Sequence, residues 1–319
     1  ARVLRLEAPS MSVSTADASM AASLVTTATM LLCDGGGSVS RVESSWEGGS
    51  CFVRRLVRSG AVVSSSSARR LRDAFVISGG LGGLGLRSAE LLVARGASRV
   101  VLSSRSGRVA RGGQGLETRL AALIGGGGVE SISCDVSDGA DALLLLRSAS
   151  RTLRGVIHAA GVVRDMLVRS ISPCDVVYVF ASKAVGASLL HSCSSAHALD
   201  ACVLVSSTAS AIGAVGQSSY AAGNAYLDSL SLCRAACGSR SACVQLPIVL
   251  GAGIGQHTLD TNTGMSAYYK SISITLDQFA LALDAVMPRG IASDASVWIS
   301  AWKFRANPSK MRRRHLTSG

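Results

Sequence analysis

Short apolar runs alternate with longer amphipathic runs from about residue 74 to residue 246. The short runs are rich in Val, Ile, Leu and Ala and predict buried β-strands, whereas the longer runs repeat apolar residues at helical spacing. The predicted strands are Phe75–Ser78, Arg99–Leu102, Val129–Cys134, Gly155–His158, Ala201–Ser206 and Ala242–Leu246. The predicted helices are Leu86–Ala94, Leu116–Ile124, Gly139–Ala149, Cys174–His191 and Ser218–Cys237.

This alternation predicts an α/β fold, in which a doubly wound parallel sheet carries helices on both faces. Ligands of such sheets bind beyond the carboxyl ends of the strands. Residues 1–73 are patterned more weakly. Val3–Leu6 is strand-like, a second patterned stretch runs from Trp46 to Arg58, and the serine run Ser64–Ser67 predicts a linker and a domain boundary.

The composition fits a globular protein, since 48% of the 319 residues are hydrophobic. The uncharged stretches are rich in Ser, Gly, Gln and Asn, so we expect no membrane span, and no signal peptide is recognised. The nine cysteines form no CxxC pair, which predicts free thiols in a reducing compartment and no metal site. We therefore expect a cytoplasmic protein, and an organelle stays open as an alternative.

The net charge of +12 permits acidic partners, but the arginines are spread along the chain, and the one dense basic cluster is Lys310–His315. No motif that reads nucleic acid accompanies this charge, so nucleic-acid binding is not expected. Four of the 32 basic residues are lysines, at positions 183, 270, 303 and 310. Because most basic positions of this chain carry Arg, the internal Lys183 indicates a role that an arginine side chain would not fill.

The run Ser78–Gly85, reading SGGLGGLG, joins the first predicted strand to the first helix. Glycines let a strand turn sharply into a helix, bring backbone N–H groups close to a pyrophosphate, and leave the helix N-terminus facing its charge. The turn therefore predicts a Rossmann-like site for a phosphate-bearing cofactor, and a glycine-rich turn without a ligand is the alternative. The residues expected to bind are Gly79, Gly80, Leu81, Gly82, Gly83, Leu84 and Gly85.

Residues after the next three strands refine the cofactor. Ser104 and Arg105 stand where an NAD enzyme carries an acidic residue, and a guanidinium there suits a 2'-phosphate, which favours NADPH. Asp135 and Val136 follow the third strand, where we expect them near the adenine. His158 ends the fourth strand and is expected to be structural. Small residues that leave room for a nicotinamide riboside follow it: Ala159, Ala160 and Gly161.

Taken together, these motifs resemble the ketoreductase domains of type I modular polyketide synthases, within the short-chain dehydrogenase/reductase superfamily. Four further motifs of that family occur in the same order: RGVIHAAG at Arg154–Gly161, KxxGxxxLH at Lys183–His191, the pair Ser206–Ser207, and GQxxYAAxNAxLD at Gly216–Asp228. The resemblance extends from about Trp46 to Trp302 and is strongest between Phe75 and Asp228.

The resemblance implies a catalytic set of Tyr220, Ser207, Lys183 and Asn224, whose spacings agree with the family. Tyr220 and Asn224 are one helical turn apart and face the same side of the predicted helix. Lys183 comes from the preceding helix, while Asn224 holds the place where ordinary short-chain reductases carry their lysine. Tyr220 and Lys183 are also implied as cofactor contacts.

The implied roles follow the chemistry of a ketone that accepts hydride, because negative charge develops on its oxygen. Tyr220 would give the proton and Ser207 would hydrogen-bond the carbonyl. A free phenol has a pKa near ~10, and we expect the Lys183 ammonium to lower it. Asn224 would orient Lys183 or hold a water in the proton relay.

The chain also departs from the motifs of the family. Pro247–Val249 replaces the usual Trp-Gly-Pro after the sixth strand, which leaves the contact on the nicotinamide face open. The Leu-Asp-Asp signature of one stereochemical class reads Val-Arg-Asp at Val163–Asp165, and the Trp of the other class is Ile212. We hypothesise the B-type stereochemical class.

The resemblance implies three parts: a partial structural subdomain and linker over residues 1–71, an NADPH-binding catalytic domain over 72–305, and a basic tail over 306–319. The implied activity is NADPH-dependent reduction of a β-ketoacyl thioester to the β-hydroxyacyl thioester in polyketide or fatty-acid-type biosynthesis. The implied partners are an acyl carrier protein, which bears the chain on phosphopantetheine, and other synthase domains. A non-catalytic structural ketoreductase and a stand-alone reductase of small ketones stay open.

Overall fold

A computed structural model describes residues 3–6, 44–47, 50–53, 56–58, 70–110, 112–149, 152–261, 264, 266–287 and 296–300. The strands are β1 (Val3–Leu6), β2 (Ser44–Glu47), β3 (Ser50–Val53), β4 (Leu56–Arg58), β5 (Ala74–Ser78), β6 (Arg99–Ser104), β7 (Val129–Ser133), β8 (Leu153–His158), β9 (Ala201–Ser207), β10 (Ala242–Leu246), β11 (Val249–Leu250), β12 (Ile274–Thr275) and β13 (Ser296–Ser300). The helices are α2 (Gly83–Ala94), α3 (Leu116–Gly125), α4 (Gly139–Ser148), η1 (Val168–Ser170), α5 (Pro173–Phe180), η2 (Ala181–Val185), α6 (Gly186–Cys193), α7 (Ala209–Ile212), α8 (Ser218–Ala236), α9 (Gly253–Thr261), α10 (Ser266–Ile272) and α11 (Leu276–Val286).

The central sheet has the order β4-β1-β13-β10-β9-β8-β5-β6-β7, and neighbouring strands from β7 to β13 are parallel. If β5 is taken as the first strand, the six strands from β7 to β10 have the order 3-2-1-4-5-6 of a dinucleotide-binding fold. The direction of winding reverses between β5 and β8. The prediction of a Rossmann-like, doubly wound α/β fold is confirmed. The reversal point matters because ligands of such sheets bind in the crevice there.

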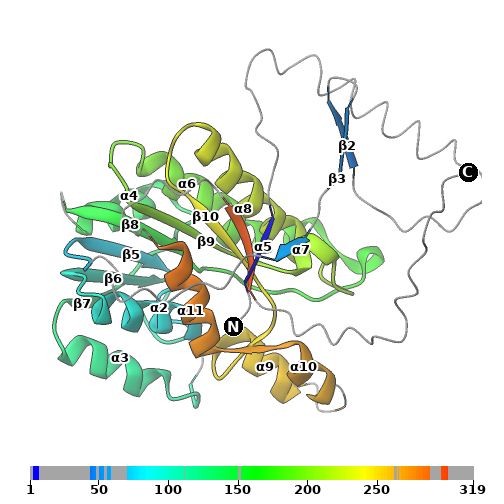
Figure 1. Ribbon diagram of the computed structural model, residues 1–319. Coiled ribbons are helices and arrows are strands. Elements are labelled where there is room, and N and C mark those ends of the chain that lie inside the picture. Colours follow the sequence, from blue (N-terminus) through cyan, green and yellow to red (C-terminus); the bar gives the residue numbers. More distant parts are fainter. Residues whose placement is uncertain are drawn as a thin grey trace, which may run out of the picture.

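Helices cover both faces of this sheet, with α2, α3 and α11 on one side and α4, α6 and α8 on the other (Figure 1). Successive side chains of a strand point to opposite faces, and β5 follows this rule. Phe75 and Ile77 join the apolar core under α2 and α11, whereas Ala74 and Val76 join the core under α4. Every residue of β5 is buried, which explains its unbroken apolar run.

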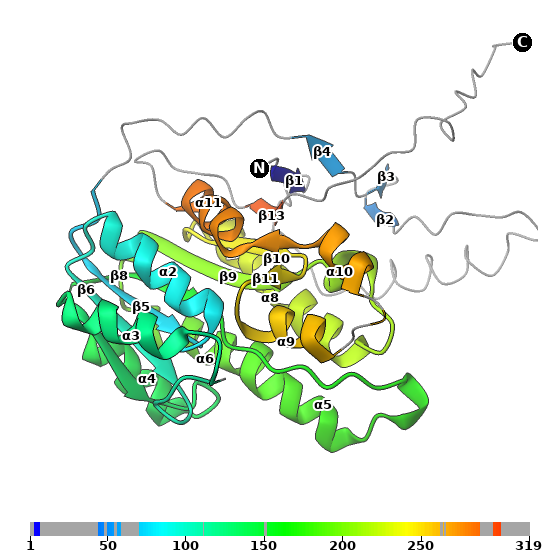
Figure 2. The ribbon, with the colours of Figure 1, turned by 90° about the horizontal axis from the view of Figure 1, so that it is seen from below.

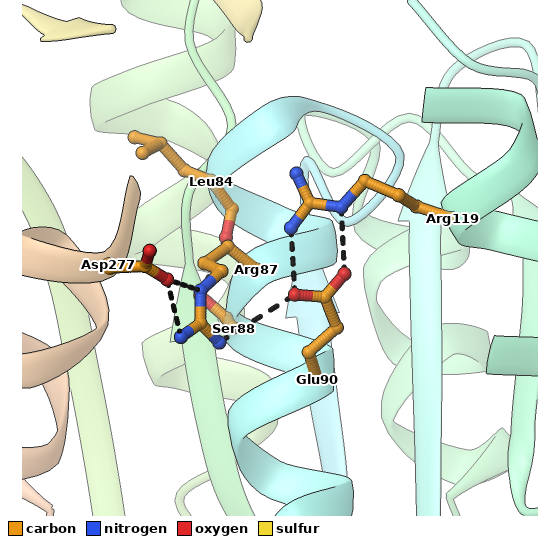
Figure 3. A network of polar contacts seen from close by, with 6 residues as sticks. All are labelled: Leu84, Arg87, Ser88, Glu90, Arg119 and Asp277. Atoms are coloured by element: carbon orange, nitrogen blue, oxygen red, sulfur yellow. Dashed lines mark hydrogen bonds and ion pairs between the residues drawn. The ribbon is translucent and has the colours of Figure 1, made fainter. Parts of the chain in front are cut away.

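Ion pairs tie α2 to its neighbours on the first face (Figure 3). Glu90 of α2 accepts two hydrogen bonds of 2.7 Å from Arg119 of α3. Arg87, one turn earlier, lies 3.0 Å from Asp277 of α11 and 3.6 Å from Glu90. The network fixes the helix that follows the glycine turn against both of its neighbours.

Two differences from the predicted helices bear on the site. The helix α2 begins at Gly83, inside the glycine turn, because residues without side chains can enter the first turn of a helix closely packed on the sheet. The single helix predicted over Cys174–His191 consists of α5, a π-helical turn η2 and α6. A π-turn keeps the helix continuous, so the apolar periodicity does not reveal it.

Of the N-terminal strands, β1 and β4 extend the central sheet beyond β13 (Figure 2), whereas β2 and β3 form a separate sheet. The strand β1 pairs antiparallel with β13, and β4 pairs antiparallel with β1, while β2 and β3 pair with each other. The predicted linker Ser64–Ser67 and the tail 306–319 lie outside the described residues. The division into domains therefore stays a prediction.

Candidate active site

A cavity of about 1130 Å³ lies at the carboxyl ends of the parallel strands. It is lined by the glycine turn, by the loops after β6, β7 and β8, and by residues of η2, α8, α9 and α10. All the residues predicted from the sequence for cofactor binding and catalysis line it except Gly80 and Asn224. These two lie directly behind the wall, as described below.

The glycine turn is packed too tightly for side chains at most of its positions. Gly79 has φ +70°, and a Cβ there would lie 2.6 Å from the backbone nitrogen of Ala160. A Cβ at Gly85 would lie 2.4 Å from the carbonyl oxygen of Gly79, and one at Gly80 would lie 2.8 Å from Leu102 on β6. Gly82 is different, because its nearest neighbour would be 3.5 Å away and it precedes the first residue of α2. The helix N-terminus therefore opens onto the cavity at Gly82.

The residues at and after the carboxyl ends of β6 and β7 line another part of the cavity. Ser104 donates a hydrogen bond to the carbonyl of Arg108, and the guanidinium of Arg105 donates one of 3.4 Å to the hydroxyl of Tyr178 on α5. Asp135 accepts hydrogen bonds from the backbone and the hydroxyl of Ser137. Arg105 and Asp135 both line the cavity, so the predicted adenosine end includes a basic and an acidic side chain.

Lys183 lies at the centre of the cavity wall, on the π-turn η2. Its side chain is 3% exposed, and its Nζ donates a 2.8 Å hydrogen bond to the carbonyl of Val205 on β9. Burial lowers the pKa of Lys183 to about 8, although Cys243 and Asp228 oppose this shift. A Cβ at Gly161 would lie 2.5 Å from Cε of Lys183, so a side chain there would displace the end of the lysine from its present position.

The helical run from Pro173 to Cys193, which contains Lys183, is long and apolar enough to cross a membrane by length and composition alone. In the fold it packs against α8 and α4 and forms one wall of the cavity. The core helix of a globular domain passes the same test of length and composition. The expectation of no membrane span stays a prediction.

His158 is hydrogen-bonded to the π-turn η2 and helps to hold it in place. It is fully buried, its Nδ1 lies 2.6 Å from the hydroxyl of Ser78, and its Nε2 lies 3.1 Å from the carbonyl of Lys183. Since a carbonyl can only accept, Nε2 carries the proton, and Nδ1 accepts from Ser78. Burial lowers the pKa of His158 to about 3, so the ring is neutral. This packing agrees with the structural role expected from the sequence.

Tyr220, Ser207 and Lys183 meet at the cavity. The Nζ of Lys183 lies 5.7 Å from the centre of the Tyr220 ring. Burial raises the pKa of Tyr220, while hydrogen bonding to Asn224 and Ser207 acts in the opposite direction. This differs from the expectation that Lys183 lowers the phenol pKa, because burial of the ring is the largest effect and Lys183, whose own pKa is about 8, loses its charge before the phenol titrates.

Asn224 lies one helical turn behind Tyr220 and is completely buried. Its amide donates a 2.8 Å hydrogen bond to the carbonyl of Tyr220. Its Oδ1 is buried and has no hydrogen-bond partner among the described residues. An unpaired buried acceptor is costly, so this oxygen is suited to a water or an ammonium.

A buried polar network continues behind these residues. Asp228 of α8 accepts hydrogen bonds of 2.6 Å from Ser210, 2.7 Å from Gln245 and 3.0 Å from the thiol of Cys243. The Ser210 hydroxyl also lies 2.7 Å from the carbonyl of Ser207, so its single proton is shared between this carbonyl and the Asp228 carboxylate. The network therefore holds the backbone at Ser207 to the helix that carries Tyr220.

Several lining residues were not predicted from the sequence. Arg164 and Tyr178 line the cavity near Arg105, and Pro247–Val249 lines it after β10. The helices α9 and α10 add Ile254, Thr258, Tyr268, Tyr269 and Ile272. Nothing in the periodicity places α9 and α10 over the cavity, because their position depends on the long connection between β10 and α11.

A family model, that of the KR domain, matches residues 74–251, more than half of the chain. Polyketide synthase GfsB from Streptomyces halstedii is 42% identical over 170 residues, which are 53% of this chain and 3% of the synthase. A phenolphthiocerol/phthiocerol polyketide synthase from Mycobacterium tuberculosis is 36% identical over 252 residues, 76% of this chain and 13% of that protein. The chain thus spans a small part of the length of these relatives.

Solved structures are similar over more of the chain than the family model matches. An A1-type ketoreductase superposes with a TM-score of 0.71 at 29% identity, covering 85% of this chain and 56% of the other. The first ketoreductase of the tylosin PKS superposes with a TM-score of 0.66 at 27% identity, covering 82% and 55%.

Proposed function

Because the chain belongs to the ketoreductase (KR) domain family of polyketide synthases, we propose that it reduces a β-ketoacyl thioester to a β-hydroxyacyl thioester with NADPH. The observation that carries the proposal is the meeting of Tyr220, Ser207 and Lys183 at a cavity that also contains the glycine turn. A ketoreductase domain with only a structural role would not need an ammonium, a phenol and a hydroxyl on one wall of this cavity.

The residues of the cavity fit NADPH. The pyrophosphate would lie at Gly82, where the N-terminus of α2 is open and a helix attracts negative charge. Arg105 would hold the 2'-phosphate, and Gly161 would let the nicotinamide riboside approach Lys183. When bound, NADPH supplies the hydride.

The protein's own groups would act on the ketone oxygen. Ser207 would donate a hydrogen bond to the carbonyl and orient it, and Tyr220 would deliver the proton as charge develops on that oxygen. A phenol whose pKa is raised by burial is protonated at neutral pH, so it is available as a donor. Lys183 would place a positive charge beside the phenol as the proton leaves. Oδ1 of Asn224 would hold a water of the proton relay, through which a proton returns to the phenolate.

We expect the substrate to be carried by the phosphopantetheine of an acyl carrier protein, beside other synthase domains in the cytoplasm. For the stereochemical class we keep the B-type hypothesis, although one similar solved structure is that of an A1-type ketoreductase. Product analysis tests it, since an A-type 3-hydroxy configuration contradicts the hypothesis.

The central test is Tyr220→Phe, with Tyr226→Phe as the matched control on the same helix, because Tyr226 does not line the cavity. NADPH oxidation is followed spectrophotometrically with a 3-oxoacyl thioester, and NADPH affinity is measured by fluorescence. We expect Tyr220→Phe to lower kcat by roughly 10²-fold or more and to leave NADPH affinity unchanged. A Tyr220→Phe variant with the wild-type rate would show that another group gives the proton.

A further inference from the structure

Two arginines from separate loops share the ring of Tyr178 at the mouth of the cavity. The guanidinium carbon of Arg105, after β6, lies 5.5 Å from the ring centre. That of Arg164, in the connection after β8, lies 4.9 Å from the same centre. All three residues line the cavity. The ring therefore holds together two cations that are 59 positions apart in the sequence.

Neither guanidinium is neutralised by a close ion pair. Among the described residues, no carboxylate lies within 4 Å of Arg105 or Arg164. Two carboxylates act from farther away: Asp175, whose pKa is lowered mainly by hydrogen bonds from Ser172 and to a smaller extent by Arg164, and Asp135, which makes a small contribution to the raised pKa of Arg105. The largest effect on the Arg105 pKa is its hydrogen bond to Tyr178. Two forked donors beside one ring form a cationic face that suits a phosphate.

We infer that Arg164 is a second cation for the 2'-phosphate of the nucleotide, and that Tyr178 is the platform that positions both arginines. This inference rests on the proposed function, in which Arg105 receives that phosphate. A phosphate monoester carries between about −1.5 and −2 charges at pH 7, so one guanidinium leaves it incompletely balanced. An anion beside the Tyr178 ring is within reach of both side chains. Arg164 is thus a residue that sets selectivity for NADPH over NADH.

The test compares NADPH and NADH affinities of the full chain, measured by cofactor fluorescence. Arg164→Gln is expected to weaken NADPH binding about ten-fold, since a hydrogen bond to a charged group contributes that much, and to leave NADH binding unchanged. Arg169→Gln is the matched control, because Arg169 is exposed on the same connection and does not line the cavity. Tyr178→Ala is expected to weaken NADPH binding without affecting NADH.

Three outcomes would overturn the inference. NADPH affinity could be unchanged in Arg164→Gln, or NADPH and NADH affinities could fall together, as in a general disturbance of the cavity. Alternatively, Arg164→Gln could raise KM for a phosphopantetheine-borne thioester only, which would assign Arg164 to the phosphate of the substrate arm. A chain that shows the expected NADPH selectivity but reduces no thioester would contradict the proposed function alone.

Discussion

At the scale of single residues, the buried Lys183 costs the fold stability while it is proposed to serve the reaction. The pKa of Lys183 is about 8 in the folded chain, against 10.5 for a free lysine side chain. The folded state therefore releases its proton at a lower pH than the unfolded state does. Below pH 8 the penalty for burying the ammonium is complete, and it decreases as pH rises towards 10.5.

We expect Lys183→Met to stabilise the cofactor-free protein at pH 7 by up to about 3 kcal/mol, from the pKa difference, while reduction is lost. The gain should decline between pH 8 and pH 10.5, because the wild-type protein becomes more stable over that range. Urea unfolding at several pH values measures it, with the exposed Lys270→Met as the control. A difference in unfolding free energy that does not change with pH would contradict this account.

At the scale of elements, the glycine turn serves both the packing of the fold and the proposed binding of the cofactor, and different glycines serve each purpose. The fold requires glycine at position 85, because a Cβ there would lie 2.4 Å from a carbonyl oxygen. A Cβ built at Gly82 would lie 3.5 Å from its nearest neighbour, so the fold leaves room for a methyl group there. This methyl group would project into the cavity.

The pair Gly82→Ala and Gly85→Ala tests this separation. We expect Gly82→Ala to keep its stability within about 1 kcal/mol and to bind NADPH about ten-fold more weakly, since the methyl displaces the pyrophosphate from the helix N-terminus. Gly85→Ala should lose about 3 kcal/mol or more, because backbone must move. Thermal unfolding and NADPH titration give both quantities. Equal destabilisation of the two variants would show that Gly82 is structural as well.

Much of the sheet could be predicted from the sequence, because its buried strands read as apolar runs and its glycine turn marks the first crossover. The site was harder to predict, since it depends on contacts between distant residues. The hydrogen bond between His158 and Ser78 and the shared ring of Tyr178 leave no periodic signal. The π-turn that carries Lys183 was missed for the same reason, whereas the positions of Ser207 and Tyr220 were found through their motifs.

At the scale of the whole molecule, β1 and β4 cover the edge of the sheet beside β13. Without them β13 would present a row of unpaired backbone groups, and such edges promote association between chains. The crossovers that form the cavity all lie between β5 and α11, away from this edge.

Deletion of residues 1–58 is therefore expected to preserve the parallel sheet and NADPH binding while raising concentration-dependent self-association. Circular dichroism, NADPH titration and analytical ultracentrifugation measure the three properties, and deletion of residues 306–319 is the control. Loss of NADPH binding together with the circular dichroism of an unfolded chain would show that residues 1–58 are part of the catalytic fold.

The burial of Lys183 also bears on the history of the sequence. Natural proteins lie close to a stability threshold, so a position that has lost its use drifts towards residues that stabilise the fold. In a lineage whose ketoreductase had become a spacer, replacement of the ammonium by an apolar side chain would be favoured by selection. The lysine at position 183 is therefore the residue expected in a lineage that is still selected for reduction.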